Sequence, residues 1–308
     1  KKCSVNKFGV ATILEGLILR EFLGREPVIY VLGYVDSKFY DEVTDSNLVL
    51  TIFDEKYGES FNTYLEKTGK TADISLKIDT GMNRLGFSDE TTLYDFTTKF
   101  PKLHVVHVMT HLSSSDSDPE YTKEQFRLFG EYIKKNNIRC HTSISNSAGI
   151  CGYDNPCSLV RPGLMLYGYS YGENQIDLKR VMRIYSKVVH VKELKKGETV
   201  SYNRTFTAEK DMTIGVVPVG YADGYRRCFS NRSFMIVNGH KCPVVGTVCM
   251  DMTMLDLTGV PLNGGYPVVE ILSDDFDAGE WAELAGTISY EILCGISDRI
   301  PRIYTEDL

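Results

Sequence analysis

The chain has 308 residues, 43% of them hydrophobic and 24% charged, and a formal net charge of −7. This composition is that of a folded soluble protein with about two domains, and it excludes a disordered or fibrous one. The negative charge argues against nucleic acid or an anionic membrane as the main partner, and no apolar run reaches the roughly 18–20 residues that span a bilayer.

The eight cysteines form no Cys-x-x-Cys pair. In a chain of this size, that pattern favours reduced thiols and a cytoplasmic location over a disulfide framework. A zinc site made from Cys140, His141, Cys151 and Cys157 is not expected, because their spacings fit no common zinc pattern. The charged start KKCSVNKFGV has no apolar stretch after it, so we expect no signal peptide.

Short β-rich runs alternate with longer helix-like stretches over the first 180 residues. The expected helices include 13–25, 88–100 and 119–137, the last with apolar residues at mostly i, i+3/i+4 spacing. This alternation predicts a parallel α/β sheet. The expected strands are 8–12, 28–33, 48–53, 73–79, 104–111, 140–145 and 158–161.

Polar and apolar residues alternate within the fourth of these strands, so that Ser75, Lys77 and Asp79 share one face. In an eight-stranded barrel that face points into the interior. Seven strands of this kind are one fewer than a closed (β/α)8 barrel needs. An open barrel would leave two strand edges unpaired.

The pattern changes at about residue 181 to strands joined by short turns. We therefore expect a barrel domain over residues 1–180 and a mostly β domain over 181–308. The turns 195–198 and Asn238-Gly239 are typical of hairpins, and only 278–284 has a helical pattern. The expected strands are 181–194, 212–220, 233–237, 244–256 and 267–272.

Polar residues gather where the barrel strands are expected to end. These positions are 79–84, Thr110-His111, 145–147 and 161–163. The carboxyl ends of the strands build the active site in barrels of this type. The residues alone therefore predict a barrel enzyme that handles a small polar ligand.

Eight motifs follow one another in a fixed order along the chain. Together they resemble the bacterial alanine racemase family over essentially the whole sequence. The resemblance implies a pyridoxal-phosphate enzyme with an N-terminal (β/α)8 barrel and a C-terminal β domain. The motifs are KIDTGMNRLGF (77–87), THLSSSD (110–116), SNSAG (145–149), VRPGLMLYG (160–168), VSYNRTFTAE (200–209), PVGYADG (218–224), VGTVCMDMTMLD (245–256) and ISYEIL (288–293).

The resemblance also implies what such an enzyme does. It interconverts L-alanine and D-alanine by a two-base mechanism and so supplies D-alanine for peptidoglycan. It acts as a head-to-tail homodimer, in which the partner's β domain completes each active site. A racemase for serine or another amino acid is the alternative within the family, and Tyr290 favours alanine over serine because serine-type relatives tend to carry a smaller polar residue there.

The resemblance assigns five positions to the cofactor. Arg161 matches the arginine that donates to the pyridine nitrogen, and a permanent charge there keeps that nitrogen unprotonated. Ser147 matches the phosphate-binding serine, together with main-chain donors near Gly163 and Leu164, and Tyr290 matches a tyrosine that reaches the phosphate. The residues alone also allow Arg161 to hold the Pro-Gly turn and Ser147 to cap a helix.

Two further positions match the catalytic machinery. Tyr202 matches one of two bases and is supplied by the opposite subunit, since racemisation removes a proton from one face of Cα and returns it on the other. His111 matches the histidine that links Tyr202 to Arg161 by hydrogen bonds. A metal site at the neighbouring histidines is not expected, because no carboxylate follows at a supporting spacing. His104 and His107 are therefore expected to be structural or surface residues.

The remaining matches concern the substrate. Arg84 matches the arginine near the substrate carboxylate, Met250 lies in the segment whose backbone meets that carboxylate, and Tyr221 resembles a pocket tyrosine. Lys77 matches a lysine that is carboxylated in some family members. An ordinary ion pair of Lys77, with Asp79 or across strands, is an equally open interpretation.

One feature of the family is missing. The lysine that links the cofactor, which the family carries before small residues and Tyr-Gly-His, has no counterpart in these residues. We expect it, with the absent strand, just upstream of Lys1, and without it the 308 residues should be inactive. Either the sequence is an incomplete part of a working racemase, or the chain is a non-enzymatic descendant that binds a ligand or partner. A decarboxylase of related architecture fits the motifs poorly.

Overall fold

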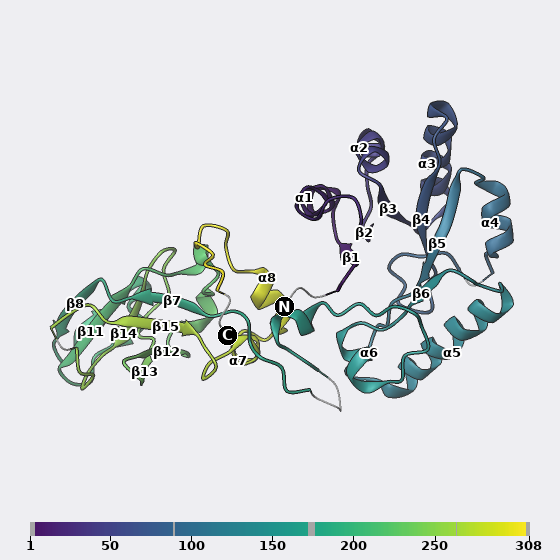
Figure 1. Ribbon diagram of the computed structural model, residues 1–308. Coiled ribbons are helices and arrows are strands. Elements are labelled where there is room, and N and C mark those ends of the chain that lie inside the picture. The colour runs from purple at the N-terminus through teal and green to yellow at the C-terminus, as the bar shows by residue number, and fades with distance from the viewer. Residues whose placement is uncertain (1–3, 89, 172–175, 263, 306–308) are drawn as a thin grey trace. The chain divides into compact units, whose positions relative to one another are not determined.

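The computed structural model describes residues 4–88, 90–171, 176–262 and 264–305 (Figure 1). The chain divides into two compact units, Lys1–Leu178 and Lys179–Leu308. None of the helices in the described ranges is long and apolar enough to cross a membrane.

Unit 1 is built on a six-stranded sheet in which all pairs are parallel and strands adjacent in the chain are adjacent in space. The first six expected strands are thus confirmed. The strands are β1 (Lys7–Val10), β2 (Val28–Val31), β3 (Leu48–Ile52), β4 (Ala72–Lys77), β5 (Leu103–Met109) and β6 (His141–Ser143).

The seventh expected strand, 158–161, is wrong as a regular strand. Only an isolated parallel bridge joins Leu159 to Ser143. The reason lies in a side chain, because the Ser158 hydroxyl accepts a hydrogen bond from the Thr142 amide, which a regular ladder would use. The segment still follows β6, since the Arg161 amide donates to the Ser145 carbonyl at 3.0 Å.

Helices follow the strands and cover the sheet, as Figure 1 shows for α3, α4 and α5. Side chains from these helices, such as Phe61, Phe96 and Phe129, are buried with Leu50 and Leu76 of the sheet in one core. The helices are α1 (Ile13–Leu23), η1 (Ser37–Phe39), α2 (Tyr40–Asp45), α3 (Glu55–Thr68), α4 (Leu93–Lys99), α5 (Pro119–Lys135), α6 (Ser147–Gly152) and η2 (Leu164–Tyr167).

The helix expected over 88–100 is shorter than predicted. It begins only at Leu93, because the Thr92 side chain accepts a hydrogen bond from the Asp95 amide and so caps the helix there. The helix expected at 119–137 is confirmed with Asp118 as its cap, and Pro119 is in the first turn, where it is tolerated.

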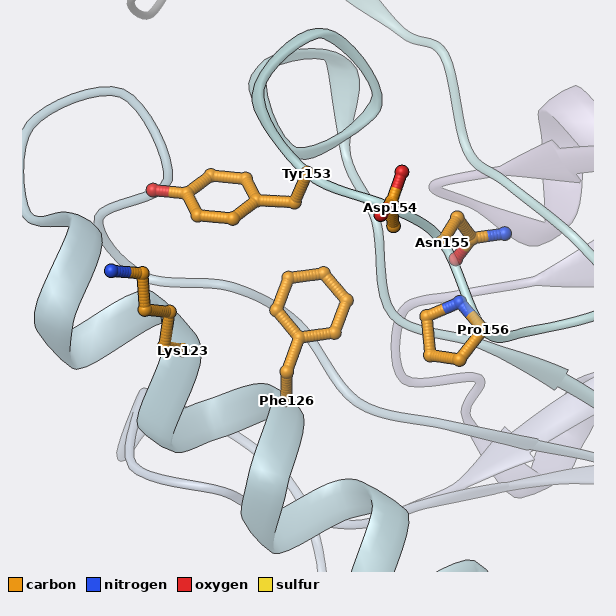
Figure 2. A pocket seen from close by; sticks show the side chains of 6 residues that line it. All are labelled: Lys123, Phe126, Tyr153, Asp154, Asn155 and Pro156. Carbon is orange, nitrogen blue, oxygen red and sulfur yellow. The ribbon is translucent and has the colours of Figure 1, made fainter.

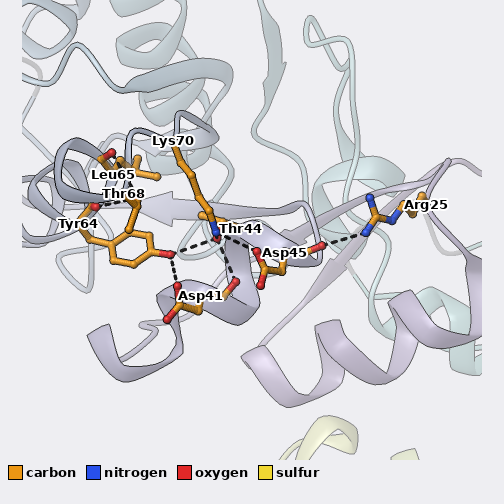
Figure 3. Close-up of polar contacts among 8 residues, drawn as sticks. All are labelled: Arg25, Asp41, Thr44, Asp45, Tyr64, Leu65, Thr68 and Lys70. Atoms are coloured by element: carbon orange, nitrogen blue, oxygen red, sulfur yellow. Dashed lines mark hydrogen bonds and ion pairs between the residues drawn. The ribbon is translucent and has the colours of Figure 1, made fainter.

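Polar contacts hold the outer helices α2 and α3 together (Figure 3). The Tyr64 hydroxyl of α3 donates to Asp41 of α2 at 2.6 Å. The Lys70 ammonium donates to Thr44 and Asp45, each at 2.9 Å. These contacts join α2 to α3 and to the residue Lys70 that follows α3.

Unit 2 contains three small antiparallel sheets, of order β14-β11-β8, β13-β12-β15-β7 and β10-β9. Its strands are β7 (Ile184–Lys187), β8 (His190–Leu194), β9 (Thr199–Val200), β10 (Phe206–Thr207), β11 (Met212–Val217), β12 (Phe234–Val237), β13 (His240–Pro243), β14 (Thr253–Asp256) and β15 (Val268–Leu272). Its helices are η3 (Tyr202–Arg204), η4 (Tyr221–Asp223), η5 (Arg227–Phe229), α7 (Ala278–Ala285) and α8 (Ser289–Cys294).

Two expected strands of unit 2 are wrong in extent. The strand over 181–194 is two strands in different sheets, because the Val188 amide bonds to Pro267 and the Val189 amide bonds to Val216. In 244–256 only β14 is regular. The preceding residues turn back on themselves, and the Cys249 amide donates to the Met252 carbonyl at 2.9 Å.

The two predicted turns and the predicted C-terminal helix of unit 2 agree with the structure only in part. Asn238 and Gly239 have φ of 49° and 77° and join the antiparallel pair β12–β13, so this hairpin is confirmed. The turn 195–198 is not a hairpin, since β8 and β9 lie in different sheets. The expected helix at 278–284 is confirmed as α7, but a second helix, α8, follows it.

Candidate active site

Lys77 ends β4 with its side chain inside unit 1, where only 6% of the residue is exposed. Burial, with Arg161 and Arg84 nearby, lowers the pKa of Lys77 to about 8. Asp79 acts on Lys77 electrostatically and raises its pKa, but by less than burial and the two arginines lower it, and none of the ion pairs within 4 Å among the described residues includes Lys77. The Asp79 carboxylate instead accepts the amides of Gly81 and Asn83 at 2.8 and 3.1 Å.

A row of polar side chains crosses the sheet beside Lys77. Ser75 Oγ is 2.8 Å from His107 Nδ1, and His107 Nε2 is 2.9 Å from Ser143 Oγ. Burial and the charge of Arg161 lower the pKa of His107 to about 3. His107 is therefore a neutral, structural residue, as expected, and it lies in the interior.

Arg161 ends this row. Its guanidinium donates to Ser143 Oγ, to the carbonyls of Thr110 and Ile144 at 2.7 and 3.1 Å, and to His111 Nδ1 at 3.2 Å. Burial lowers the pKa of Arg161 to about 10, so the group remains charged at neutral pH. Its four acceptors lie on two segments, 110–111 after β5 and 143–144 at the end of β6, so the Arg161 side chain joins the ends of two neighbouring strands.

His111 is placed for one defined role. Burial, followed by the charge of Arg161, lowers its pKa to about 3, so the imidazole is neutral. Because a guanidinium can only donate, Nδ1 must accept from Arg161, and the proton of the neutral ring lies on Nε2. His111 thus has an N–H to offer to a further oxygen.

Ser147 is the first residue of α6, after the capping residue Asn146. Its hydroxyl oxygen accepts hydrogen bonds from the amides of Gly163 and Met165 at 3.1 and 3.3 Å. Two main-chain donors and one hydroxyl thus converge at the ends of two strand-like segments, which suits an anion. The sequence indicated main-chain donors at Gly163 and Leu164; Gly163 donates to Ser147, the Met165 amide is a further donor there, and the Leu164 amide stays a prediction.

Gln125 of α5 is a site neighbour that the sequence analysis missed. It is fully buried, and its amide nitrogen donates to the His111 carbonyl at 3.1 Å and to Thr80 at 3.3 Å. Its oxygen accepts the Ser113 amide at 2.9 Å. The available signal was its spacing, because Gln125 shares the buried face of this helix with Thr122, Phe129 and Tyr132. Arg84 lies on the exposed loop after β4.

The other predicted residues lie in unit 2 and are exposed: Tyr202 by 68%, Met250 by 53%, Tyr221 by 45% and Tyr290 by 41%. Backbone contacts join the first three, because the Tyr221 amide donates to Cys249, the Ala222 amide donates to Met250, and Thr247 donates to the Tyr202 carbonyl. Tyr290 lies on α8. Unit 2 thus presents a surface with exposed aromatic and Met side chains.

No group of three or more His, Cys, Asp or Glu side chains arranged for a metal occurs in the described ranges. His104 is on the surface, 3.8 Å from an Asp73 oxygen. A cavity lies among the described residues of each unit. One of about 370 Å³ is lined by Lys123, Phe126 and Tyr153 with neighbours and contains none of the predicted residues (Figure 2). One of about 390 Å³ includes Tyr202 and Cys249.

Comparisons with known proteins match both units. The profile of the alanine racemase N-terminal domain matches residues 1–171, and that of the alanine racemase C-terminal domain matches residues 181–304. The alanine racemase of Clostridium novyi is 37% identical over 97% of this chain and 81% of its own length. Alanine racemase 1 of Clostridium acetobutylicum is 36% identical over 98% of this chain and 82% of its own.

Solved structures agree. The alanine racemase of E. faecalis superposes with a TM-score of 0.90 at 31% identity, over 97% of this chain and 83% of that one. That of Bartonella henselae, with covalently bound pyridoxal phosphate, has a TM-score of 0.86 at 29% identity, over 97% and 85%. The expected fold class, a barrel followed by a β domain, is confirmed.

The buried neutral histidine gives a pH-dependent stability. The pKa of His107 is about 3 in the fold, below its ordinary value, so the unfolded chain binds more protons and acid favours unfolding. His107 therefore contributes stability above about pH 6.5 that is lost as the pH falls toward 3. We expect His107→Gln to reduce the fall in unfolding free energy between pH 7 and 5 by about 2 kcal/mol.

Urea unfolding at a series of pH values measures this slope. His104→Gln is the matched control, since His104 is exposed and the slope should stay unchanged. An equal slope in His107→Gln and the parent protein would show that His107 is not held neutral.

Proposed function

The chain belongs to the alanine racemase family, and we propose that it interconverts L-alanine and D-alanine with pyridoxal phosphate as cofactor. The observation that carries the proposal is the contact between Arg161 and His111, which leaves a buried cation and an oriented imidazole N–H at the strand ends. Members of the family are pyridoxal-phosphate racemases, and the relatives cited above are alanine racemases.

The residues present fit the cofactor. Its phosphate would be held by the Ser147 hydroxyl and the amides of Gly163 and Leu164, next to the Met165 amide that also points at Ser147. The side chain of Tyr290 from a second subunit would join them. The Arg161 guanidinium would donate to the pyridine nitrogen. When bound, the cofactor withdraws electrons from Cα and makes its proton acidic.

Proton transfer is then the task of Tyr202. The reference pKa of a tyrosine is about 10, so its phenolate needs stabilisation to act as a base near neutral pH. The Nε2–H of His111 is the donor for that oxygen, and Arg161 holds the ring from the other side. The other face of Cα requires a second base, which is the family's cofactor lysine.

The substrate carboxylate would be bound by Arg84 and by the backbone around Met250, with Tyr221 at the edge of the pocket. Lys77 would support the binding of the substrate carboxylate if its amine adds CO₂ and becomes a carbamate. A lysine must be neutral to add CO₂, and a pKa of about 8 makes about a tenth of the amine neutral at pH 7. The carbamate would be negative and would offset the charges of Arg84 and Arg161.

The predicted site residues are divided between unit 1 and unit 2, and active sites shared between two subunits would bring them together. We propose a head-to-tail homodimer in which Tyr202, Tyr221, Met250 and Tyr290 of one subunit meet the barrel residues of the other. The exposure of these four residues in one chain supports this arrangement. We further propose a cytoplasmic enzyme that supplies D-alanine for peptidoglycan.

The first test is racemisation itself, in a chain that also carries the cofactor lysine. We expect turnover of either alanine enantiomer, slower turnover of serine, and a loss of about 10²–10⁴-fold in kcat for Tyr202→Phe with the cofactor still bound. Tyr266→Phe is the control, because Tyr266 is similarly exposed, at 62% against 68% for Tyr202, and is not one of the predicted site residues. Bound cofactor without turnover in the parent protein would instead favour a non-enzymatic binding protein.

The second test concerns Lys77. In buffer with carbon-13-labelled bicarbonate, we expect a carbamate signal in carbon-13 NMR that disappears in Lys77→Met. Lys70→Met should retain it, because Lys70 is paired with Asp45 and its pKa is raised, which disfavours the neutral amine. A signal that survives in Lys77→Met would place the modification elsewhere.

The third test is complementation between two inactive variants, Tyr202→Phe and Arg161→Ala. If sites are shared, a mixed dimer contains one intact site, and co-expression should restore about a quarter of the parent activity. Tyr202→Phe co-expressed with Tyr202→Ala should restore none. No recovery in the first mixture, despite mixed dimers seen by native mass spectrometry, would mean that each site forms within one chain.

A further inference from the structure

The turn that carries Tyr202 has a backbone that side-chain-bearing residues rarely adopt. Ser201, Asn203 and Arg204 have φ values of 65°, 62° and 53°. This left-handed region crowds the Cβ atom of every residue except glycine. Such a turn persists only when the surrounding contacts hold it.

The phenol of Tyr202 is not held by contacts of its own. The side chain is 68% exposed, and within the part of the chain that the structure describes no hydrogen bond involves its hydroxyl. The position of the phenol therefore depends on the backbone of the turn, which fixes where the side chain begins.

Thr247 anchors that backbone on both sides of Tyr202. Thr247 is buried, with 3% of its surface exposed. Its hydroxyl donates to the Tyr202 carbonyl at 2.9 Å, and its own carbonyl accepts the Ser201 hydroxyl at 2.6 Å. Its hydroxyl is also 3.2 Å from that of Thr205.

The direction of these hydrogen bonds is fixed. A carbonyl only accepts, so the single proton of Thr247 Oγ1 goes to Tyr202, and Thr205 must donate to Thr247. Thr205 Oγ1 in turn accepts from Asn231 Nδ2 at 3.1 Å. The other end of that amide accepts the Gly246 N–H at 2.6 Å, which fixes the amide orientation.

The segment that holds the turn also approaches it closely. Gly246 has φ of +81°, and a Cβ there would lie 2.8 Å from the Val200 carbonyl. Two residues after Thr247, the Cys249–Met250 backbone receives the amides of Tyr221 and Ala222. One short segment therefore fixes both the Tyr202 turn and the substrate side of unit 2.

We propose that Thr247 is a positioning residue for Tyr202. Its hydroxyl, oriented by Thr205 and Asn231, locks the strained turn and so aims the phenol at the substrate Cα. It acts on the proton transfer and leaves cofactor and substrate binding to other groups. The inference rests on the proposed function, which makes Tyr202 a base.

The experiment compares Thr247→Val, which removes the hydroxyl, with Thr247→Ser, which keeps it, in the full-length holoenzyme. For Thr247→Val we expect kcat to fall about tenfold, the size of one lost hydrogen bond, with KM and cofactor absorbance changed by less than about twofold. With Cα-deuterated alanine, the isotope effect should rise for one enantiomer only. Thr247→Ser should recover most of the rate.

A second readout does not depend on activity. Hydrogen–deuterium exchange of the segment 199–207, followed by mass spectrometry, should become faster in Thr247→Val and stay unchanged in Thr247→Ser. Thr122→Val is the matched control, because Thr122 is also fully buried and its hydroxyl donates to the Asp118 carbonyl at 2.8 Å, far from the turn in sequence and in the other unit.

The outcomes separate the two proposals. Unchanged exchange in Thr247→Val, or an equal loss of kcat in Thr122→Val, overturns the role of Thr247. If the parent holoenzyme does not racemise alanine, the proposed function fails, and the exchange result alone decides whether Thr247 holds the turn.

Discussion

A permanently charged guanidinium lies inside the parallel sheet of unit 1, and its neighbours have to be compatible with it. Among the described residues, Arg161 has no carboxylate as a hydrogen-bond partner; it donates to carbonyls, a hydroxyl and an imidazole. Burial, and after it the charge of Arg161, lowers the pKa values of His107, His111 and Lys77. The interior is therefore a region where added negative charge is favoured and added positive charge is not, which suits an anionic ligand.

The two groups of site residues are held in different ways. In unit 1, buried side chains hold one another through the row from Ser75 to Arg161, and the sheet fixes their spacing. In unit 2, the exposed side chains of Tyr202 and Tyr221 depend on backbone contacts beneath them. A residue that must reach into another surface has to remain exposed, so its orientation comes from its turn.

The sequence pattern predicted the elements whose periodicity is local and missed those set by tertiary contacts. Alternation in β4 and the Asn238-Gly239 turn identified a parallel strand and a hairpin. The chain passes from one sheet to another at Val188 because its hydrogen-bond partners, such as Pro267, lie far along the chain. The local residue pattern does not indicate this change. The same holds for the site. Arg161 and Ser147 could be predicted from their side chains, whereas the Met165 amide is a main-chain donor that a residue of almost any type could supply.

Thr247 and Gln125 show why a site is larger than its motif. Neither touches a proposed reacting atom, yet each is buried and bonded to the backbone of a residue that does: Thr247 to Tyr202, and Gln125 to His111. Removing one such hydroxyl or amide leaves a partly buried carbonyl without its donor, which favours a shift of the backbone toward another donor. The loss of the donor matters more for Tyr202 than for His111. The turn of Tyr202 has an unfavourable backbone and its side chain is exposed, so a small rotation of the turn displaces the phenol oxygen. The neutral ring of His111 stays fixed by Arg161.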